Sequence, residues 1–144
     1  MIGTHLIKTY AKTLAVLALS SGEAELMSLV KASAEGMGVQ AICRDFQENM
    51  SIEVQSDASA AIGMVRRKGL GKVRHLATSD LWVQSKQAAG DIVYTKVNGK
   101  DNPADAFTKG LDEGTLLRHM QAIGVYRLTG RAEVAPAAKS STVQ

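Results

Sequence analysis

Hydrophobic and polar positions along the chain predict a mixture of short strands and helices. Near the start, residues 4–9 are mixed in character and rich in β-prone side chains, and residues 13–19 form an apolar run. Both stretches are predicted to be strands, although the apolar run would also suit a buried helix. The polar group Ser20, Ser21 and Gly22 follows the run directly and favours a strand that ends there.

A long helical pattern follows this first pair of strands. Its apolar row recurs at intervals of three to five residues and consists of Leu26, Leu29, Val30, Ser33, Met37, Ile42 and Phe46. The pattern predicts a helix over residues 22–47, with Ser21 as its N-cap. Glu23 and Glu25 fall in the first turn, where the helix dipole favours acidic side chains, so their position has a structural explanation.

The rest of the chain alternates between strand and helix patterns. The expected elements are a strand at 51–56, a short helix of small residues after Asp57, an amphipathic helix at 73–89, a strand at 92–97, a loop at 98–102, a helix starting at Pro103 and a helix at 113–123. This order predicts an α/β fold with a mixed sheet and helices packed on it. Residues 125–144 lack a periodic apolar face and are predicted to form a flexible tail.

Composition narrows the class of protein. A chain of 144 residues that is 45% hydrophobic fits one domain with a core, which must be aliphatic because aromatic residues make up 4%. The formal charge of +3 favours an anionic partner only weakly. The single Cys43 excludes an intrachain disulfide, suits a reducing, intracellular compartment and is expected to fill space in the core. The sequence has no apolar run long enough to span a bilayer.

Three acidic residues are the candidates for chemistry. Glu25 lies at the head of the long helix, Asp57 directly follows a predicted strand, and Asp105 lies at the start of a later helix. Carboxylates delivered by separate elements are a usual way to hold two divalent metal ions for phosphodiester chemistry. Position alone is weak support, because an Asp at a strand end is more often a turn or cap residue.

Four segments together carry a resemblance to a known family. They are LALSSGEAELMSLVKA, VQSDASAAIGM, GLGKVRHLATSDLWVQ and VNGKDNPADAFTKGL. In this order and spacing they resemble the ribonuclease H domain at the C-terminal end of copia-type retrotransposon polyproteins. The resemblance covers residues 3–124, and it implies a ribonuclease H-like mixed sheet with helices on both faces.

The resemblance also implies an activity and a site. Members of this family hydrolyse the RNA strand of RNA–DNA hybrids with Mg²⁺ or Mn²⁺ during reverse transcription. Glu25, rather than Glu23, matches the family's helix glutamate, and Asp57 and Asp105 match two of its aspartates. These three residues are therefore the expected catalytic residues and metal ligands.

A basic stretch is the candidate surface for the hybrid. It comprises Arg66, Arg67, Lys68, Lys72 and Arg74. Hybrids are read through backbone and 2′-OH contacts, which suits a basic and sequence-indifferent surface. A solvated basic loop is an equally good interpretation. His75 is expected to hold the start of the following helix, and Trp82 is expected to anchor that helix in the core.

One family feature has no counterpart in the sequence. The family fold begins with a central strand that carries the first catalytic aspartate, in a stretch like SDADWAGD upstream of the segment that here begins at Thr4. We therefore expect the isolated chain to bind metal weakly and to have little or no nuclease activity. Either the sheet closes up, with the first hairpin on strand 51–56, or another protein chain supplies a strand. The alternative function is a non-catalytic subunit, nucleic-acid-binding or structural, derived from such a domain.

Overall fold

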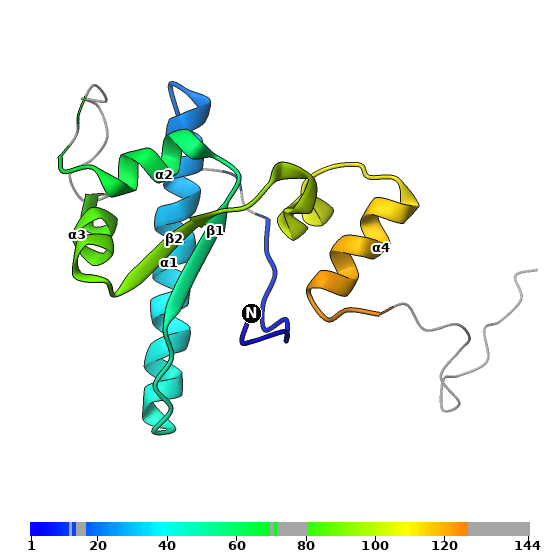
Figure 1. The fold of residues 1–144 in the computed structure, drawn as a ribbon, viewed down its shortest axis with the longest axis horizontal. Coiled ribbons are helices and arrows are strands. Elements are labelled where there is room, and N and C mark those ends of the chain that lie inside the picture. The colour runs from blue at the N-terminus through cyan, green and yellow to red at the C-terminus, as the bar shows by residue number, and fades with distance from the viewer. Residues whose placement is uncertain (12, 14–16, 70, 72–80, 127–144) are drawn as a thin grey trace, which may run out of the picture. The chain divides into compact units, whose positions relative to one another are not determined.

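The computed structural model describes residues 1–11, 13, 17–69, 71 and 81–126, which form two compact units (Figure 1). The larger unit is Ala11–Asn102, and the smaller unit combines Met1–Tyr10 with Pro103–Gln144. The larger unit contains α1 (Ser21–Asp45), β1 (Ile52–Ser56), α2 (Ser59–Arg66), α3 (Trp82–Ala89), β2 (Ile92–Lys96) and the 3₁₀ turn η2 (Gly99–Asp101). The smaller unit contains the 3₁₀ helix η3 (Pro103–Phe107) and α4 (Glu113–Ala122). None of the described helices has the length and apolar character needed to cross a membrane.

The two strands form a parallel sheet. Their register runs from Ile52 opposite Ile92 to Ser56 opposite Lys96, and beyond β2 the N–H of Val97 donates to the Ser56 carbonyl at 3.0 Å. Parallel strands need a long crossover connection, and here that connection contains α2 and α3. The predicted α/β class is confirmed as a mixed arrangement of four helices and one small sheet in the described residues.

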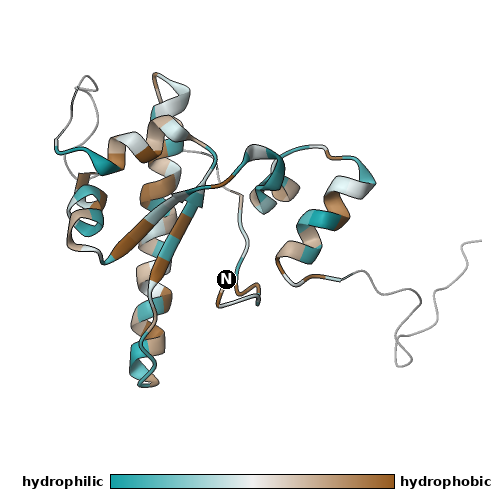
Figure 2. Cartoon of the chain, viewed as in Figure 1, coloured by the Kyte–Doolittle hydropathy of each residue, from teal (hydrophilic) through white to brown (hydrophobic). Residues whose placement is uncertain are grey.

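Only one face of this sheet is buried. In β1, Ile52, Val54 and Ser56 are buried and the residues between them are exposed, and β2 buries Ile92 and Tyr94. Figure 2 shows the corresponding alternation of apolar and polar residues along the strands. The described strands are therefore a parallel pair covered on one face, which is less than the predicted mixed sheet with helices on both faces.

Helix α1 packs closely on this buried face. A Cβ added to Gly36 would lie 3.0 Å from Cγ2 of Ile52, so the helix backbone is nearly in contact with β1 at that point. Deeper in the core, the hydroxyl groups of Ser33 and Tyr94 lie 2.7 Å apart, and Ser33 also donates to the Leu29 carbonyl at 2.7 Å. Burial raises the pKa of Tyr94, and the hydrogen bond with Ser33 partly offsets this rise. These contacts join the helix to both strands.

The ends of α1 differ from the sequence prediction. The N-cap is Ser20, one residue before the predicted Ser21, because the Ser20 hydroxyl accepts from the N–H of Glu23. At the other end, Ile42 is 59% exposed and Phe46 is 75% exposed, so their predicted place on the core row is wrong. At about 100° per residue they lie on the side of the helix opposite Leu26, which is buried.

Predictions for the first residues met different outcomes. Residues 4–9 were expected to form a strand, but in the structure they do not: this segment contains only one end of an isolated bridge between Ile2 and His5. The expected strand over 13–19 lies partly outside the described residues, as does the first half of the helix expected over 73–89. The predicted tail also lies outside them from residue 127 onward.

The smaller unit is built around α4. Asp112 caps this helix by accepting from the N–H of Thr115 at 3.0 Å, and the hydrogen bonds from Thr115 lower the pKa of Asp112. Gly124, just after the helix, has φ +72°, and a Cβ there would lie 2.5 Å from the Thr4 carbonyl oxygen. The N-terminal segment therefore runs against the end of α4. The helix predicted to begin at Pro103 is the short 3₁₀ helix η3 instead.

Two glycines in α1 test the contact between this helix and the sheet. Gly38→Ala should raise the free energy of unfolding by about 0.5–1 kcal/mol, because alanine is the better helix former and nothing lies within 4 Å of the new Cβ. Gly36→Ala should give a smaller gain or a loss, because its Cβ meets Ile52. Urea denaturation of both variants measures the difference, and equal gains would contradict the close packing at Gly36.

Candidate functional site

The carboxyl ends of β1 and β2 bring the clearest candidate group, Asp57, into position. Asp57 directly follows β1 and is half-buried, and a Cβ added to Gly99 would lie 3.3 Å from its Oδ2 atom. The loop after β2 therefore runs beside the carboxylate. Within the described residues this carboxylate accepts no hydrogen bond and makes no ion pair. Ligands of open α/β sheets bind at this end of the strands.

Short polar contacts hold the chain around Asp57. The Ser56 hydroxyl accepts from the N–H of Ala58 at 3.1 Å, which fixes the turn from β1 into α2. Lys96, at the end of β2, donates to the Ser59 hydroxyl and so ties the two segments together. These contacts occupy the neighbouring side chains and leave the Asp57 carboxylate available for a ligand.

The two glutamates at the start of α1 have different roles. Glu23 is 4% exposed, and its Oε2 atom accepts from the N–H of Leu19 at 2.9 Å while its own N–H donates to Ser20. This reciprocal arrangement resembles a capping box and accounts for the buried acid. Glu25, two residues later, is exposed and has no partner in the described part of the chain. Glu25 is therefore the acid that remains free for other work.

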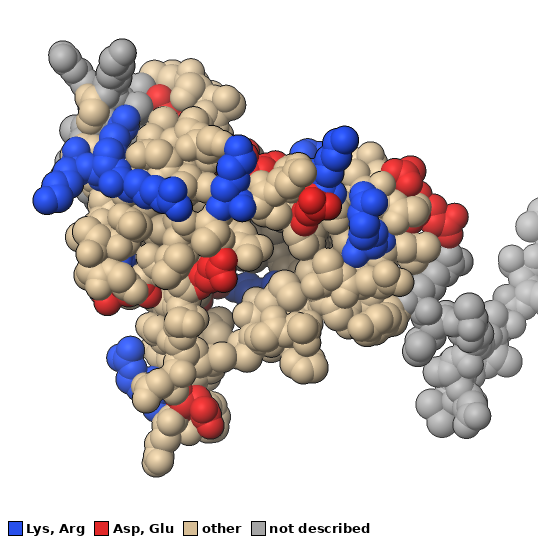
Figure 3. All heavy atoms as spheres, in the orientation of Figure 1, with Lys and Arg blue, Asp and Glu red and all other residues tan. Residues whose placement is uncertain are grey.

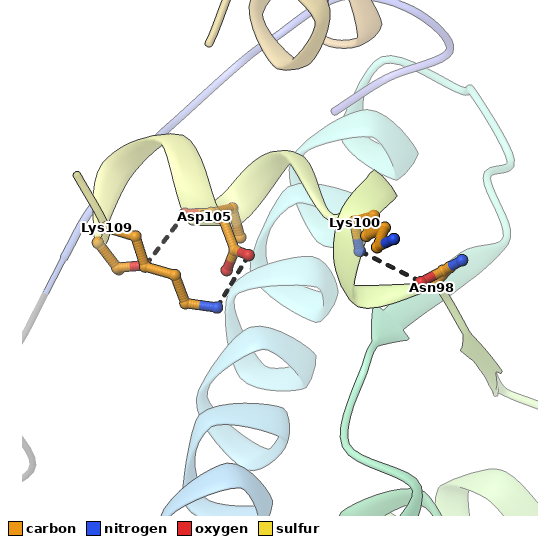
Figure 4. Close-up of polar contacts among 6 residues, drawn as sticks. Asn98, Lys100, Asp105 and Lys109 are labelled. Atoms are coloured by element: carbon orange, nitrogen blue, oxygen red, sulfur yellow. Dashed lines mark hydrogen bonds and ion pairs between the residues drawn. The ribbon is translucent and has the colours of Figure 1, made fainter. Parts of the chain in front are cut away.

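Asp105 lies in the smaller unit, within η3. Its side chain is 14% exposed, and Oδ2 lies 2.9 Å from Nζ of Lys109, one helical turn later (Figure 4). The same figure shows Asn98 in the larger unit, whose Oδ1 accepts from the N–H of Lys100 at 3.2 Å. The ion pair with Lys109 partly neutralises Asp105, which separates it from Asp57 and Glu25 in character.

Metal binding was the role expected for Glu25, Asp57 and Asp105. In the portion of the chain that is described, no group of three or more His, Cys, Asp or Glu side chains is placed to hold a metal ion. Glu25 and Asp57 belong to the larger unit and Asp105 belongs to the smaller one. Of the three, Asp57 has the setting that best suits a ligand, because its carboxylate is partly shielded from water and has no described partner.

The basic stretch after α2 is partly engaged in holding the structure. Arg66 donates to the Tyr94 carbonyl at 2.8 Å and so covers the outer edge of β2. The guanidinium of Arg67 lies against Gly71, where an added Cβ would be 2.6 Å from Cζ. Lys68 is exposed. Figure 3 shows Lys and Arg side chains gathered on the same side of the molecule as α2 and α3. The predicted contacts Lys72 and Arg74, and also His75, lie outside the described residues.

One organising residue escaped the sequence reasoning. The side chain of Gln84 in α3 donates to the carbonyls of Met64 and Gly69, at 2.8 and 3.1 Å, and accepts from the Gly69 N–H at 2.8 Å. It therefore fixes the course of the chain directly after the basic residues. A glutamine on an amphipathic helix carries no sequence signal for such a role, because the partners are brought to it by the fold.

Comparison of the chain with protein-family models, with curated proteins and with solved structures found no match. What the site can do is therefore argued from its own residues and their geometry.

The contrast between Glu23 and Glu25 can be measured through stability. Glu23→Ala should lower the free energy of unfolding by about 1–3 kcal/mol, because it removes the acceptor of the Leu19 N–H and half of the capping arrangement. Glu25→Ala, the matched control in the same turn, should change it by less than about 0.5 kcal/mol, because the side chain is exposed. Equal losses in urea denaturation would assign Glu25 a structural role and contradict its availability.

Proposed function

We propose that the chain is a ribonuclease H-type domain derived from a retrotransposon reverse-transcriptase polyprotein, which binds RNA–DNA hybrids and has little or no nuclease activity by itself. The resemblance of four ordered segments to the copia-type family supports this assignment. The observation that carries it furthest is the half-buried Asp57 carboxylate at the carboxyl ends of two parallel strands, with the backbone at Gly99 beside it.

The proposed chemistry is hydrolysis of a phosphodiester bond in the RNA strand. Glu25, Asp57 and Asp105 are the proposed ligands for Mg²⁺ or Mn²⁺, ions that prefer oxygen ligands. When bound, a pair of such ions would activate water and stabilise the leaving oxygen. Asp105 would have to exchange its ion pair with Lys109 for the metal. In the family a further aspartate completes the set, so three acids support weak metal binding at most.

The proposed surface for the hybrid lies on the basic residues after α2. Lys68 is the exposed cation, and Arg66 and Arg67 flank it with their guanidinium groups held by the fold. Fixed cations beside a mobile one suit contact with a phosphate backbone, because each released counterion contributes to affinity. We also include Lys72 and Arg74 in this surface by sequence position.

A non-catalytic subunit derived from such a domain is the second candidate. The observation that favours it is the ion pair between Asp105 and Lys109, because a lysine held 2.9 Å from a catalytic acid competes with metal. Such a subunit would bind nucleic acid without cleaving it, or would serve only in a protein assembly.

Hybrid binding and cleavage separate these candidates. The 144-residue chain should bind an RNA–DNA hybrid with an affinity that falls as salt rises, and Lys68→Gln should reduce the slope of log K against log salt by about 0.9, the value of one phosphate contact. Fluorescence anisotropy measures this, and Lys31→Gln on α1, which removes the same charge elsewhere, is the control. Absence of salt-dependent binding would contradict the hybrid and favour a structural subunit.

Cleavage is followed in the same mixtures with Mg²⁺ or Mn²⁺. We expect no turnover above the buffer control. Turnover that Asp57→Asn abolishes would contradict the impaired activity while supporting the assignment of the site.

A protein partner that adds a strand to the sheet is a further part of the proposal. The Ser56 carbonyl faces β2, and successive residues of an extended strand turn their peptide groups to opposite edges, so Glu53 and Gln55 face away from β2. Within the described residues no strand pairs with that edge. On the far side of β2, Arg66 already occupies the Tyr94 carbonyl. The outer edge of β1 is therefore the place where a strand from another chain would pair.

Hydrogen–deuterium exchange tests this edge. In the isolated chain the amides of Glu53 and Gln55 should exchange much faster than those of Val54 and Ser56, which face β2. Addition of a partner that supplies a strand should slow exchange at Glu53 and Gln55 selectively. Slow exchange at all four amides in the isolated chain would show that the edge is already covered and would exclude this partner.

A further inference from the structure

A pocket of about 300 Å³ lies in the larger unit, at the end of the sheet away from Asp57. Its apolar wall consists of Met37 from α1 and of Ile52 and Ile92, the first residues of β1 and β2. Its polar wall consists of Gln40, Arg44, Lys86 and Asp91. The pocket is separate from the acids and the basic stretch already described, so it does not depend on the proposed function.

The polar wall occupies positions where the fold would ordinarily place apolar side chains. Along α1, Leu26, Leu29, Ser33 and Met37 form the row that faces the strands, and helical spacing continues this row to Gln40 and Arg44. Meanwhile the apolar Ile42 and Phe46 lie on the opposite side and are exposed. The helix therefore turns a polar side toward the sheet one turn beyond its closest contact at Gly36.

The side chains of the polar wall are held apart. The Gln40 amide donates to the Met50 carbonyl at 2.6 Å, which fixes it against the chain that enters β1. On α3, Lys86 forms an ion pair with Asp91 at 2.8 Å. Such an ammonium group has three N–H donors, so two remain after this contact. Among the described residues nothing pairs with the guanidinium of Arg44, which has five donors.

The charges around the pocket sum to one positive charge. Arg44 and Lys86 are cations and Asp91 is an anion, so a ligand with one negative charge would neutralise the set. The helix dipole accounts for a cation near the end of α1, but it does not account for the apolar hollow beside it. A carboxylate fits two cations with unused donors better than a neutral group does.

We propose that this pocket binds a small organic carboxylate, with its apolar body against Met37, Ile52 and Ile92 and its carboxylate between Arg44 and Lys86. The volume is at the lower limit of ligand pockets, so the body is a single ring or a branched chain of similar size. Arg44 is the main anchor, because Lys86 shares its charge with Asp91.

Phenylacetate is the probe, and its neutral isostere phenylacetamide is the control. In methyl-labelled full-length chain, NMR titration with millimolar phenylacetate should shift the methyl signals of Met37, Ile52 and Ile92 together. Phenylacetamide should produce at least about fivefold weaker binding, because it lacks the charge. Arg44→Gln should weaken phenylacetate binding by about three- to tenfold, with allowance for the exposure of this side chain.

Lys31→Gln is the matched protein control, because it removes one positive charge from the same helix at a position outside the pocket. Both substitutions affect exposed side chains, and unchanged methyl spectra without ligand confirm that each variant is folded. The proposal is overturned if phenylacetate leaves the three methyl signals unshifted, if the amide binds equally well, or if Lys31→Gln weakens binding as much as Arg44→Gln does.

Discussion

The packing of α1 against the parallel pair β1 and β2 is the constraint on which the larger unit depends. A two-stranded sheet is marginal alone, and its one buried face needs a cover. At Gly36 the helix nearly touches Ile52, and the hydroxyl pair of Ser33 and Tyr94 ties the same helix to the second strand. Because these contacts are close and partly polar, they set how far along the strands the helix can lie.

This packing produces two functional ends. The start of α1 lies against α2, where a Cβ on Gly22 would meet Ala60 at 3.5 Å, so the head of the helix stands near the turn that carries Asp57. The last turns of α1 extend alongside the first residues of the strands, where Arg44 contributes to a pocket. The carboxyl ends of the strands thus present acids, whereas their amino ends present mainly cations around an apolar hollow.

Polar residues divide into those that hold the fold and those that remain available. Glu23 and Arg66 each satisfy a backbone group, and Gln84 satisfies several. Burying such groups without partners would cost free energy, so these side chains are committed to structure. Glu25 and Asp57 carry no such commitment in the described residues. The distinction matters for function because residues of one chemical type, adjacent in sequence, have opposite roles.

Local patterns by themselves determined the α/β class, the long helix, the strand over Ile52–Ser56 with its alternating burial, and the place of Asp57 at the end of that strand. These features depend on residue spacing, which short-range geometry reads directly. The tertiary structure alone decided that residues 4–9 are not a strand, because a strand needs a partner that no local pattern supplies.

Tertiary structure also decided that Ile42 and Phe46 lie outside the core and that Glu23 rather than Glu25 is buried. A helix has apolar positions on more than one side, and only packing selects the side that is covered. The sequence therefore determined which residues could take part in a site, and long-range contacts determined which of them were left free to do so.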